Sequence, residues 1–235
     1  MIKAILFDLD GTLLPMDEEV FTKAYFSLLC QKVAPYGYEP KQLISTIWAG
    51  TKQMMKNDGS KSNEQAFWEV FEQNYGEERM KDKRLFDSFY AHEFTQTKAV
   101  CEENPLAKEI VRYAREKFGR VVLSTNPIFP KVGTLTRMGF IGLTEEDFDL
   151  VTTYENSRFC KPNPAYFQDI LQRFSLSPDE VILFGNNESE DGDCAYRCGI
   201  RCYLVGDHVI ESEKKLTEYE RIPMNKVIET MNKYL

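Results

Sequence analysis

The sequence predicts an α/β fold, in which a parallel β-sheet carries helices on both faces and an all-helical segment is inserted after the first strand. Two observations support this prediction. From about residue 100 onward, short apolar runs alternate with segments of helical spacing, which is typical of a parallel sheet covered by helices. Residues 15–100 instead show helical spacing throughout. With 235 residues, 43% of them hydrophobic, the chain can form a core domain and a smaller second one.

Five strands are predicted from short apolar runs bounded by polar or turn residues. They lie at residues 3–9 (KAILFDL), 119–126 (GRVVLSTN), 149–154 (DLVTTY), 180–187 (EVILFGNN) and 200–206 (IRCYLVG). The expected helices between and before these strands lie at residues 104–118, 130–138, 164–174 and 190–198. Because parallel strands need crossover connections, such helices are expected to cover both faces of the sheet.

Residues 15–100 are predicted to form about four helices and no strand. Aromatic and aliphatic residues recur there at helical spacing, and turn signals occur in the segments APYGYEP, NDGSKSN and NYGEER. An all-helical insertion at this point suggests a cap domain. We therefore divide the chain into an α/β core, residues 1–14 and 101–235, and a helical cap, residues 15–100. The tryptophans of the cap, Trp48 and Trp68, are expected to pack between helices.

Composition restricts the partners and the location that we expect. The formal net charge is −8 and no long run of Lys or Arg occurs, which argues against nucleic acid and anionic membranes as partners. The six cysteines form no CxxC pair, and both histidines are distant from them in the sequence, which argues against structural zinc. No signal-peptide pattern and no apolar run of about 18 residues are present. We therefore expect a cytoplasmic protein.

The first predicted strand ends in two carboxylates, within the segment Asp8-Leu9-Asp10-Gly11-Thr12. Taken alone, this segment has a simple structural interpretation, because Asp-Gly is a turn pair and Asp or Thr can cap a helix. Other polar groups, however, follow the later apolar runs. They are Ser124, Thr125, Asn126, Lys161, Asn186 and Asp191. Because ligands bind at the carboxyl ends of parallel strands, we expect these groups to gather in one site.

The chemistry of these groups fits phosphoryl transfer. One carboxylate can act as a nucleophile and form an acyl phosphate, while a second exchanges a proton with the leaving group. Mg²⁺ prefers oxygen ligands and would neutralise the clustered negative charge. A hydroxyl and a lysine would hold the phosphate and offset charge in the transition state.

With the segment DLDGTL and the ordered motifs after it, the chain resembles the haloacid dehalogenase-like (HAD) hydrolases, in particular the subgroup with a helical cap and a Rossmann-like core. The resemblance covers nearly the whole chain. It implies that Asp8 is the nucleophile, that Asp10 is the general acid and base, and that Lys161 stabilises the phosphoryl group. It also implies substrate binding by Gly11, Thr12, Ser124, Thr125 and Asn126, with Ser124 as the phosphate ligand and the backbone of Asn126 helping.

The acidic loop departs from the family pattern, which has Gly-Asp followed by a second Asp four or five residues later. Here the pair is Gly185-Asn186, and Asp191 holds the fifth position. By resemblance, Mg²⁺ is expected at Asp8, the carbonyl of Asp10, Asn186 and Asp191. An Asn can coordinate Mg²⁺ through its amide oxygen but brings no charge. The alternative is that nearby acids, Glu188, Glu190 or Asp191, compensate for it.

In the cap, the segment IWAGTKQ (residues 47–53) interrupts a helical pattern with Ala-Gly-Thr. Similar family members place a specificity loop about here, so Thr51 and Lys52 are candidate substrate contacts. The alternative is an interhelical turn that carries a solvated lysine.

We therefore expect a Mg²⁺-dependent phosphatase that hydrolyses a small phosphorylated metabolite through an aspartyl-phosphate intermediate. A haloacid dehalogenase needs no acid at the position of Asp10, so Asp10 favours phosphate chemistry. Two alternatives remain open: a sugar-phosphate mutase of the same superfamily, and a phosphometabolite-binding protein without turnover. The substitution at Asn186 favours the second alternative. The retained site residues argue against it: Asp8, Asp10, Ser124 and Lys161.

Overall fold

The computed structural model describes all 235 residues and contains a six-stranded sheet, entirely parallel, in the order β3-β2-β1-β4-β5-β6. The strands are β1 (Ala4–Phe7), β2 (Arg120–Leu123), β3 (Leu150–Val151), β4 (Val181–Gly185), β5 (Arg201–Val205) and β6 (Glu220–Ile222). The five predicted strands are confirmed. The sixth was not predicted, because β6 is a three-residue edge strand with two exposed residues and therefore shows no apolar run.

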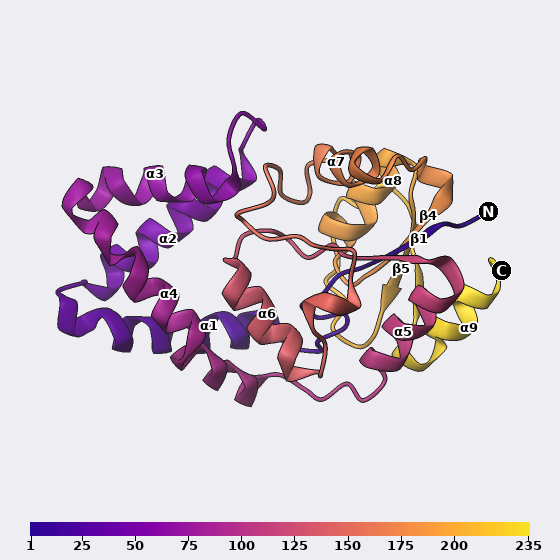
Figure 1. The fold of residues 1–235 in the computed structure, drawn as a ribbon, viewed down its shortest axis with the longest axis horizontal. Coiled ribbons are helices and arrows are strands. Elements are labelled where there is room, and N and C mark those ends of the chain that lie inside the picture. Colours follow the sequence, from indigo (N-terminus) through magenta and orange to yellow (C-terminus); the bar gives the residue numbers. More distant parts are fainter.

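Helices cover both faces of this sheet, as expected (Figure 1). The helices α5 (Ala107–Phe118) and α9 (Val227–Asn232) lie on one face, and α7 (Ala165–Phe174) and α8 (Cys194–Cys198) on the other. The central strand β1 shows how both faces are filled. Its Ile5 and Phe7 belong to the apolar cluster that includes α5, whereas Ala4 and Leu6 belong to the cluster that includes α7, since successive side chains of a strand point to opposite faces.

The insertion after β1 is all helical and lies at the end of the molecule opposite to the two termini (Figure 1). Its helices are α1 (Glu18–Val33), α2 (Pro40–Met55), α3 (Asn63–Tyr75) and α4 (Lys83–Ala91). Local signals explain where two of them begin: the Asp17 carboxylate accepts hydrogen bonds from the first turn of α1, and Ser62 with Gln65 forms a capping box on α3. The interior is aromatic, with Trp68 and Phe86 in a ring cluster.

The expected break in the segment 47–53 is wrong, because α2 continues without interruption through Gly50. The glycine serves helix packing. A Cβ atom built on Gly50 would lie 2.5 Å from Cδ2 of Phe67 on α3, so only glycine allows the two helices to approach this closely. The tryptophans also differ from each other: Trp68 is buried as expected, whereas Trp48 is 52% exposed.

The helix α6 (Lys131–Phe140) connects the two parts of the molecule, because it follows β2 and contacts α4 of the insertion. None of the helices combines the length and the apolar character that crossing a membrane requires.

Candidate active site

Three strands bring the candidate residues to one edge of the sheet. Phe7 at the end of β1 pairs with Leu123 of β2 and with Phe184 of β4, so the residues that follow them lie at the same level. The amide of Asp8 donates a hydrogen bond to the carbonyl of Phe184 (2.9 Å), and that of Ser124 donates to the carbonyl of Phe7 (2.7 Å). The site therefore lies at the carboxyl ends of the central strands, where the chain passes to strands on either side of β1.

Lys161 joins two carboxylates at this edge. Its Nζ atom lies 2.8 Å from Oδ1 of Asp8 and 2.5 Å from Oδ1 of Asp191. All three side chains are buried. Burial raises the pKa of Asp8 well above its ordinary value, and Lys161 opposes this shift. For Lys161 itself, burial would lower the pKa, but the charges of Asp191 and Asp8 outweigh burial and raise it well above its ordinary value, so the lysine stays protonated.

The turn after Asp8 is formed around Gly11, which has φ +77°. A Cβ atom there would lie 2.1 Å from Nδ2 of Asn186, so glycine is required both by the backbone conformation and by the close approach of the acidic loop. The hydroxyl of Thr12 lies 3.4 Å from Oδ2 of Asp8 and 3.3 Å from Oδ1 of Asn186. Thr12 thus links the first motif to the acidic loop.

Asp10 faces a cation that the sequence analysis missed. Nε of Arg137, on α6, lies 3.0 Å from Oδ1 of Asp10, and the arginine side chain is fully buried. The two groups form an ion pair without an aligned hydrogen bond, and both terminal nitrogens of Arg137 lack a hydrogen-bond partner. The guanidinium carbon instead lies 4.1 Å from the ring centre of Phe129, a cation–π contact. Burial raises the pKa of Asp10, and Arg137 opposes this shift.

A sequence signal for Arg137 was present. On α6 the buried residues Thr134, Arg137 and Met138 follow the i, i+3, i+4 spacing of one helix face, so an arginine stands where an apolar residue is expected. A charged residue on the buried face of a helix generally needs a partner.

The three polar residues after β2 point to different places. The hydroxyl of Ser124 donates to the carbonyl of Phe7 (3.2 Å), and its side chain is fully buried. Thr125 and Asn126, in contrast, line the cleft that contains Asp8 and Asp10. The amide of Asn126 donates to Oε2 of Glu190 (2.9 Å). The structure therefore brings Thr125 and Asn126 to the cleft, and it directs the Ser124 hydroxyl into the sheet.

The acidic loop after β4 turns tightly around Asp191. Oδ2 of this carboxylate accepts hydrogen bonds from the backbone amides of Asn186 (3.0 Å) and Asn187 (3.1 Å). Glu188, one of the acids expected to compensate for Asn186, points elsewhere and pairs with Arg221 at 3.0 Å. Glu190 lines the cleft, where burial raises its pKa to about 7.

The cleft encloses about 250 Å³ between the strand ends and the cap helices. The cap residues that line it are Met16, Glu18, Phe21, Thr22, Trp48, Thr51 and Met55. Lys52, the other cap residue that was expected to contact a substrate, is exposed on the outside of α2 and does not line the cleft. One turn of a continuous helix, rather than a loop, therefore presents Thr51 to the strand ends.

The donor set in this cleft fits a hard divalent cation. No group of three or more His, Cys, Asp or Glu side chains is arranged to hold a metal ion, so main-chain carbonyl, amide oxygen and water would have to complete a site, as Mg²⁺ accepts. The cleft is lined by five carboxylates, namely Asp8, Asp10, Glu18, Glu190 and Asp191. The cations in contact with them are Lys161 and Arg137, which leaves negative charge to be balanced.

Comparison with known proteins identifies the family to which a chain with this fold and this site belongs. A family model for haloacid dehalogenase-like hydrolases matches residues 2–199. The chain belongs to this family, and it is a hydrolase of the haloacid dehalogenase-like type.

The sequence identity to individual known proteins is low. The chain is 24% identical over 233 residues to a phosphorylated carbohydrates phosphatase of Thermotoga maritima, covering 98% of this chain and 97% of that protein. Among solved structures, a 2-haloacid dehalogenase from Pseudomonas syringae superposes with a TM-score of 0.66 at 18% identity over the full length of both chains. A HAD phosphatase from Thermococcus onnurineus gives a TM-score of 0.60 at 18% identity and 98% coverage of both chains. At these identities the structural matches show a shared fold.

Proposed function

We propose that the protein is a Mg²⁺-dependent phosphatase that hydrolyses a small phosphomonoester through a phosphorylated Asp8. The observation that carries this proposal is the arrangement around Asp8: a buried carboxylate at the end of β1, 2.8 Å from Lys161, in the same cleft as a second carboxylate, Asp10. The name of the Thermotoga maritima relative, a phosphatase of phosphorylated carbohydrates, supports phosphate chemistry.

The proposed reaction has two steps. A carboxylate oxygen of Asp8 attacks phosphorus, the bond between phosphorus and the ester oxygen breaks, and the Asp10 carboxyl gives its proton to the departing alkoxide. Asp10 then takes a proton from a water molecule, whose oxygen attacks the phosphorus and releases inorganic phosphate and Asp8. Lys161 offsets the charge of the phosphoryl oxygens in both steps. The Arg137 guanidinium holds the Asp10 side chain beside the cleft.

The metal site that we propose is formed by Asp8, the main-chain carbonyl of Asp10, the amide oxygen of Asn186 and Asp191. When bound there, Mg²⁺ would neutralise phosphate and carboxylate charge. For the phosphate, we propose that the hydroxyl of Thr125 is the side-chain donor, because Ser124 is already engaged by the carbonyl of Phe7. Asn126 lines the same cleft, whereas Gly11 and Thr12 lie in the turn that follows Asp8.

We further propose that residues 15–100 act as a cap domain on a core of residues 1–14 and 101–235, and that the cap selects the substrate and excludes bulk water. Its contacts with the cleft through Thr22, Trp48 and Thr51 support this role. Such an enclosed site suits a small metabolite better than a phosphoprotein or a nucleic acid.

Release of inorganic phosphate from simple phosphomonoesters, with and without EDTA, tests the proposal. We expect Mg²⁺-dependent release by the wild type and none by Asp8→Asn, since an amide is a poor nucleophile. The fold of the variant is checked by circular dichroism. Wild-type release by Asp8→Asn would refute the mechanism. Conversion of a sugar phosphate to its isomer without phosphate release would identify a mutase, and binding without either reaction would identify a binding protein.

A further inference from the structure

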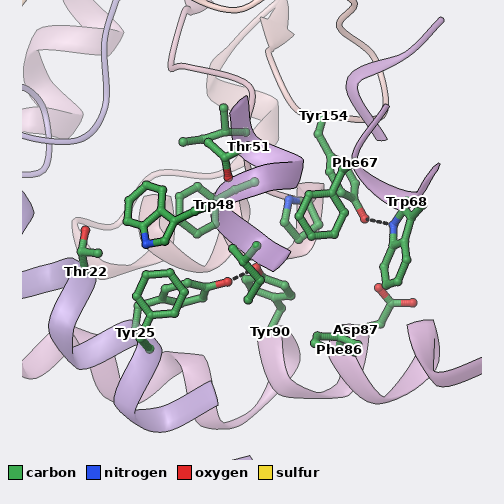
Figure 2. Close-up of a pocket in the computed structure, with 15 residues that line it drawn as sticks. Thr22, Tyr25, Trp48, Thr51, Phe67, Trp68, Phe86, Asp87, Tyr90 and Tyr154 are labelled. Atoms are coloured by element: carbon green, nitrogen blue, oxygen red, sulfur yellow. Dashed lines mark hydrogen bonds between the residues drawn. The ribbon is translucent and has the colours of Figure 1, made fainter. Parts of the chain in front are cut away.

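A second hollow, lined mainly by aromatic rings, lies where the cap meets the core (Figure 2). It is formed between α1, α2, α3 and α4 on one side and the segment 128–130 with Tyr154 on the other. The aromatic rings of the cap that line it are Tyr25, Phe26, Trp48, Phe67, Trp68, Phe86 and Tyr90. The hollow encloses about 100 Å³. An apolar cavity of about 150 Å³ holds one benzene molecule, so this hollow has room for no more than one ring.

This aromatic pocket lies next to the cleft that contains Asp8. The two spaces share five lining residues, namely Thr22, Trp48, Thr51, Ile128 and Phe129. A phosphomonoester with its phosphorus at Asp8 would therefore extend its alcohol portion past Thr51 toward the rings. The unbroken course of α2 places Trp48 and Thr51, three residues apart, on the face that borders both spaces.

The polar groups of the pocket mostly satisfy one another. The hydroxyls of Tyr25 and Tyr90 form a hydrogen bond of 2.9 Å, and the indole of Trp68 donates to the hydroxyl of Tyr154 (3.3 Å), as the dashed lines in Figure 2 show. Burial raises the pKa of Tyr25 to about 12, so its hydroxyl is neutral. A guest with several hydroxyls, such as a sugar, would lose hydration at this wall without finding enough partners in return.

The charge of the pocket excludes a second anionic group on the substrate. No lysine or arginine lines the pocket, and its one charged residue is Asp87, an acid exposed at the margin. A second phosphate or a carboxylate would therefore meet no cation there and one repelling carboxylate. Pyrophosphate and sugar bisphosphates do not match this lining.

We propose that the substrate is a phosphomonoester whose alcohol carries one uncharged aromatic or heteroaromatic ring, and that this ring binds among Trp48, Phe67 and Tyr90 while the phosphate lies at Asp8. This inference rests on the proposed phosphatase function and specifies its substrate class. Ring stacking and removal of the ring from water favour binding at this wall.

The test compares esters whose leaving alcohols are similar in acidity but differ in the ring: 2-phenylethyl phosphate, ethyl phosphate and glucose 6-phosphate. Burial of a phenyl-sized group predicts that kcat/KM for 2-phenylethyl phosphate exceeds that for ethyl phosphate by about 10-fold or more. Glucose 6-phosphate is expected to react no faster than ethyl phosphate. Equal kcat/KM values for the ring ester and ethyl phosphate, or a preference for glucose 6-phosphate, would overturn the inference and leave the phosphatase function intact.

Two variants locate the ring. Trp48→Ala removes a half-exposed side chain from the pocket wall and should lower the ratio of kcat/KM for 2-phenylethyl phosphate over ethyl phosphate by about 5-fold or more. Tyr196→Ala is the matched control, because Tyr196 is an aromatic residue of similar exposure (55%) on α8. It should leave the ratio unchanged. A ratio that Trp48→Ala does not change, in a variant with the wild-type melting temperature, would overturn the inference.

Calorimetry separates the inference from the proposed reaction. If none of the three esters is hydrolysed, the phosphatase proposal fails for these substrates, but the pocket is still tested by the binding of 2-phenylethyl phosphate. Tighter binding of this ester than of ethyl phosphate, lost in Trp48→Ala and kept in Tyr196→Ala, would support the aromatic pocket without turnover. Equal binding of both esters would overturn it.

Discussion

Replacement of Lys161 by methionine should lower the melting temperature of the protein markedly, and the decrease should grow with pH. The ammonium group lies 2.8 Å from Asp8 and 2.5 Å from Asp191, and all three side chains are buried. Methionine has a similar length but no charge, so the two carboxylates would face each other without a cation. Removing one partner from a buried ion pair costs about 3–5 kcal/mol. For a chain of this size, 1 kcal/mol corresponds to about 2–4 °C, so we expect the melting temperature to fall by about 10 °C.

The pH dependence follows from Asp8. Burial already raises the pKa of Asp8, and Lys161 opposes that shift, so the variant raises the folded-state pKa further above that of the unfolded chain. A carboxyl with a raised folded-state pKa binds more protons in the folded state, so stability falls as pH rises through the interval between the two pKa values. The difference between wild type and Lys161→Met should therefore be smaller at pH 5 than at pH 8.

Thermal unfolding followed by circular dichroism in EDTA, at both pH values, measures this difference. Lys52→Met is the matched control, because Lys52 is an exposed lysine on α2 and its loss should shift the melting temperature by less than about 1 °C. The reasoning is refuted if Lys161→Met melts like the wild type at pH 8, or if its loss of stability is the same at pH 5. Addition of Mg²⁺ should recover part of the loss, since a bound cation would replace the missing charge.

Four further predictions concern chemistry and binding. Asp10→Asn should slow hydrolysis of ethyl phosphate by about 100-fold or more but that of p-nitrophenyl phosphate much less, because a good leaving group needs little acid assistance. Arg137→Met should reproduce this dependence on the leaving group, in addition to lowering the melting temperature; equal slowing of both esters would show a structural role only. Thr125→Val should raise KM for phosphate esters about 10-fold, whereas Ser124→Ala should chiefly cost about 1 kcal/mol of stability through its hydrogen bond; the reverse result would return the phosphate contact to Ser124. Asn186→Asp should lower the Mg²⁺ concentration that gives half-maximal activity, and an unchanged titration would remove Asn186 from the metal site.

The sequence by itself determined the elements that carry a strong local signal: the strands at 3–9 and 180–187, the helical insertion, and the position of Asp8 directly after a strand. These are local properties. An apolar run of a few residues, a turn pair or a capping residue fixes backbone conformation through interactions within about one turn of the chain. The order of polar strand ends then predicted that Asp8 and Lys161 meet, because parallel strands end at a common edge.

Only the tertiary structure decided where particular side chains point. Ser124 and Thr125 are neighbours, yet one hydroxyl faces the sheet and the other residue borders the cleft, since a shift of one residue at a strand end reverses the direction of the side chain. Gly50 predicted a break in the helix, but in the structure it lies within α2 and allows Phe67 of α3 to approach closely. Arg137 and Asp10 are 127 positions apart in the sequence, and no local pattern encodes which partner a buried charge finds. Such contacts depend on distances between elements, which packing of the whole chain sets.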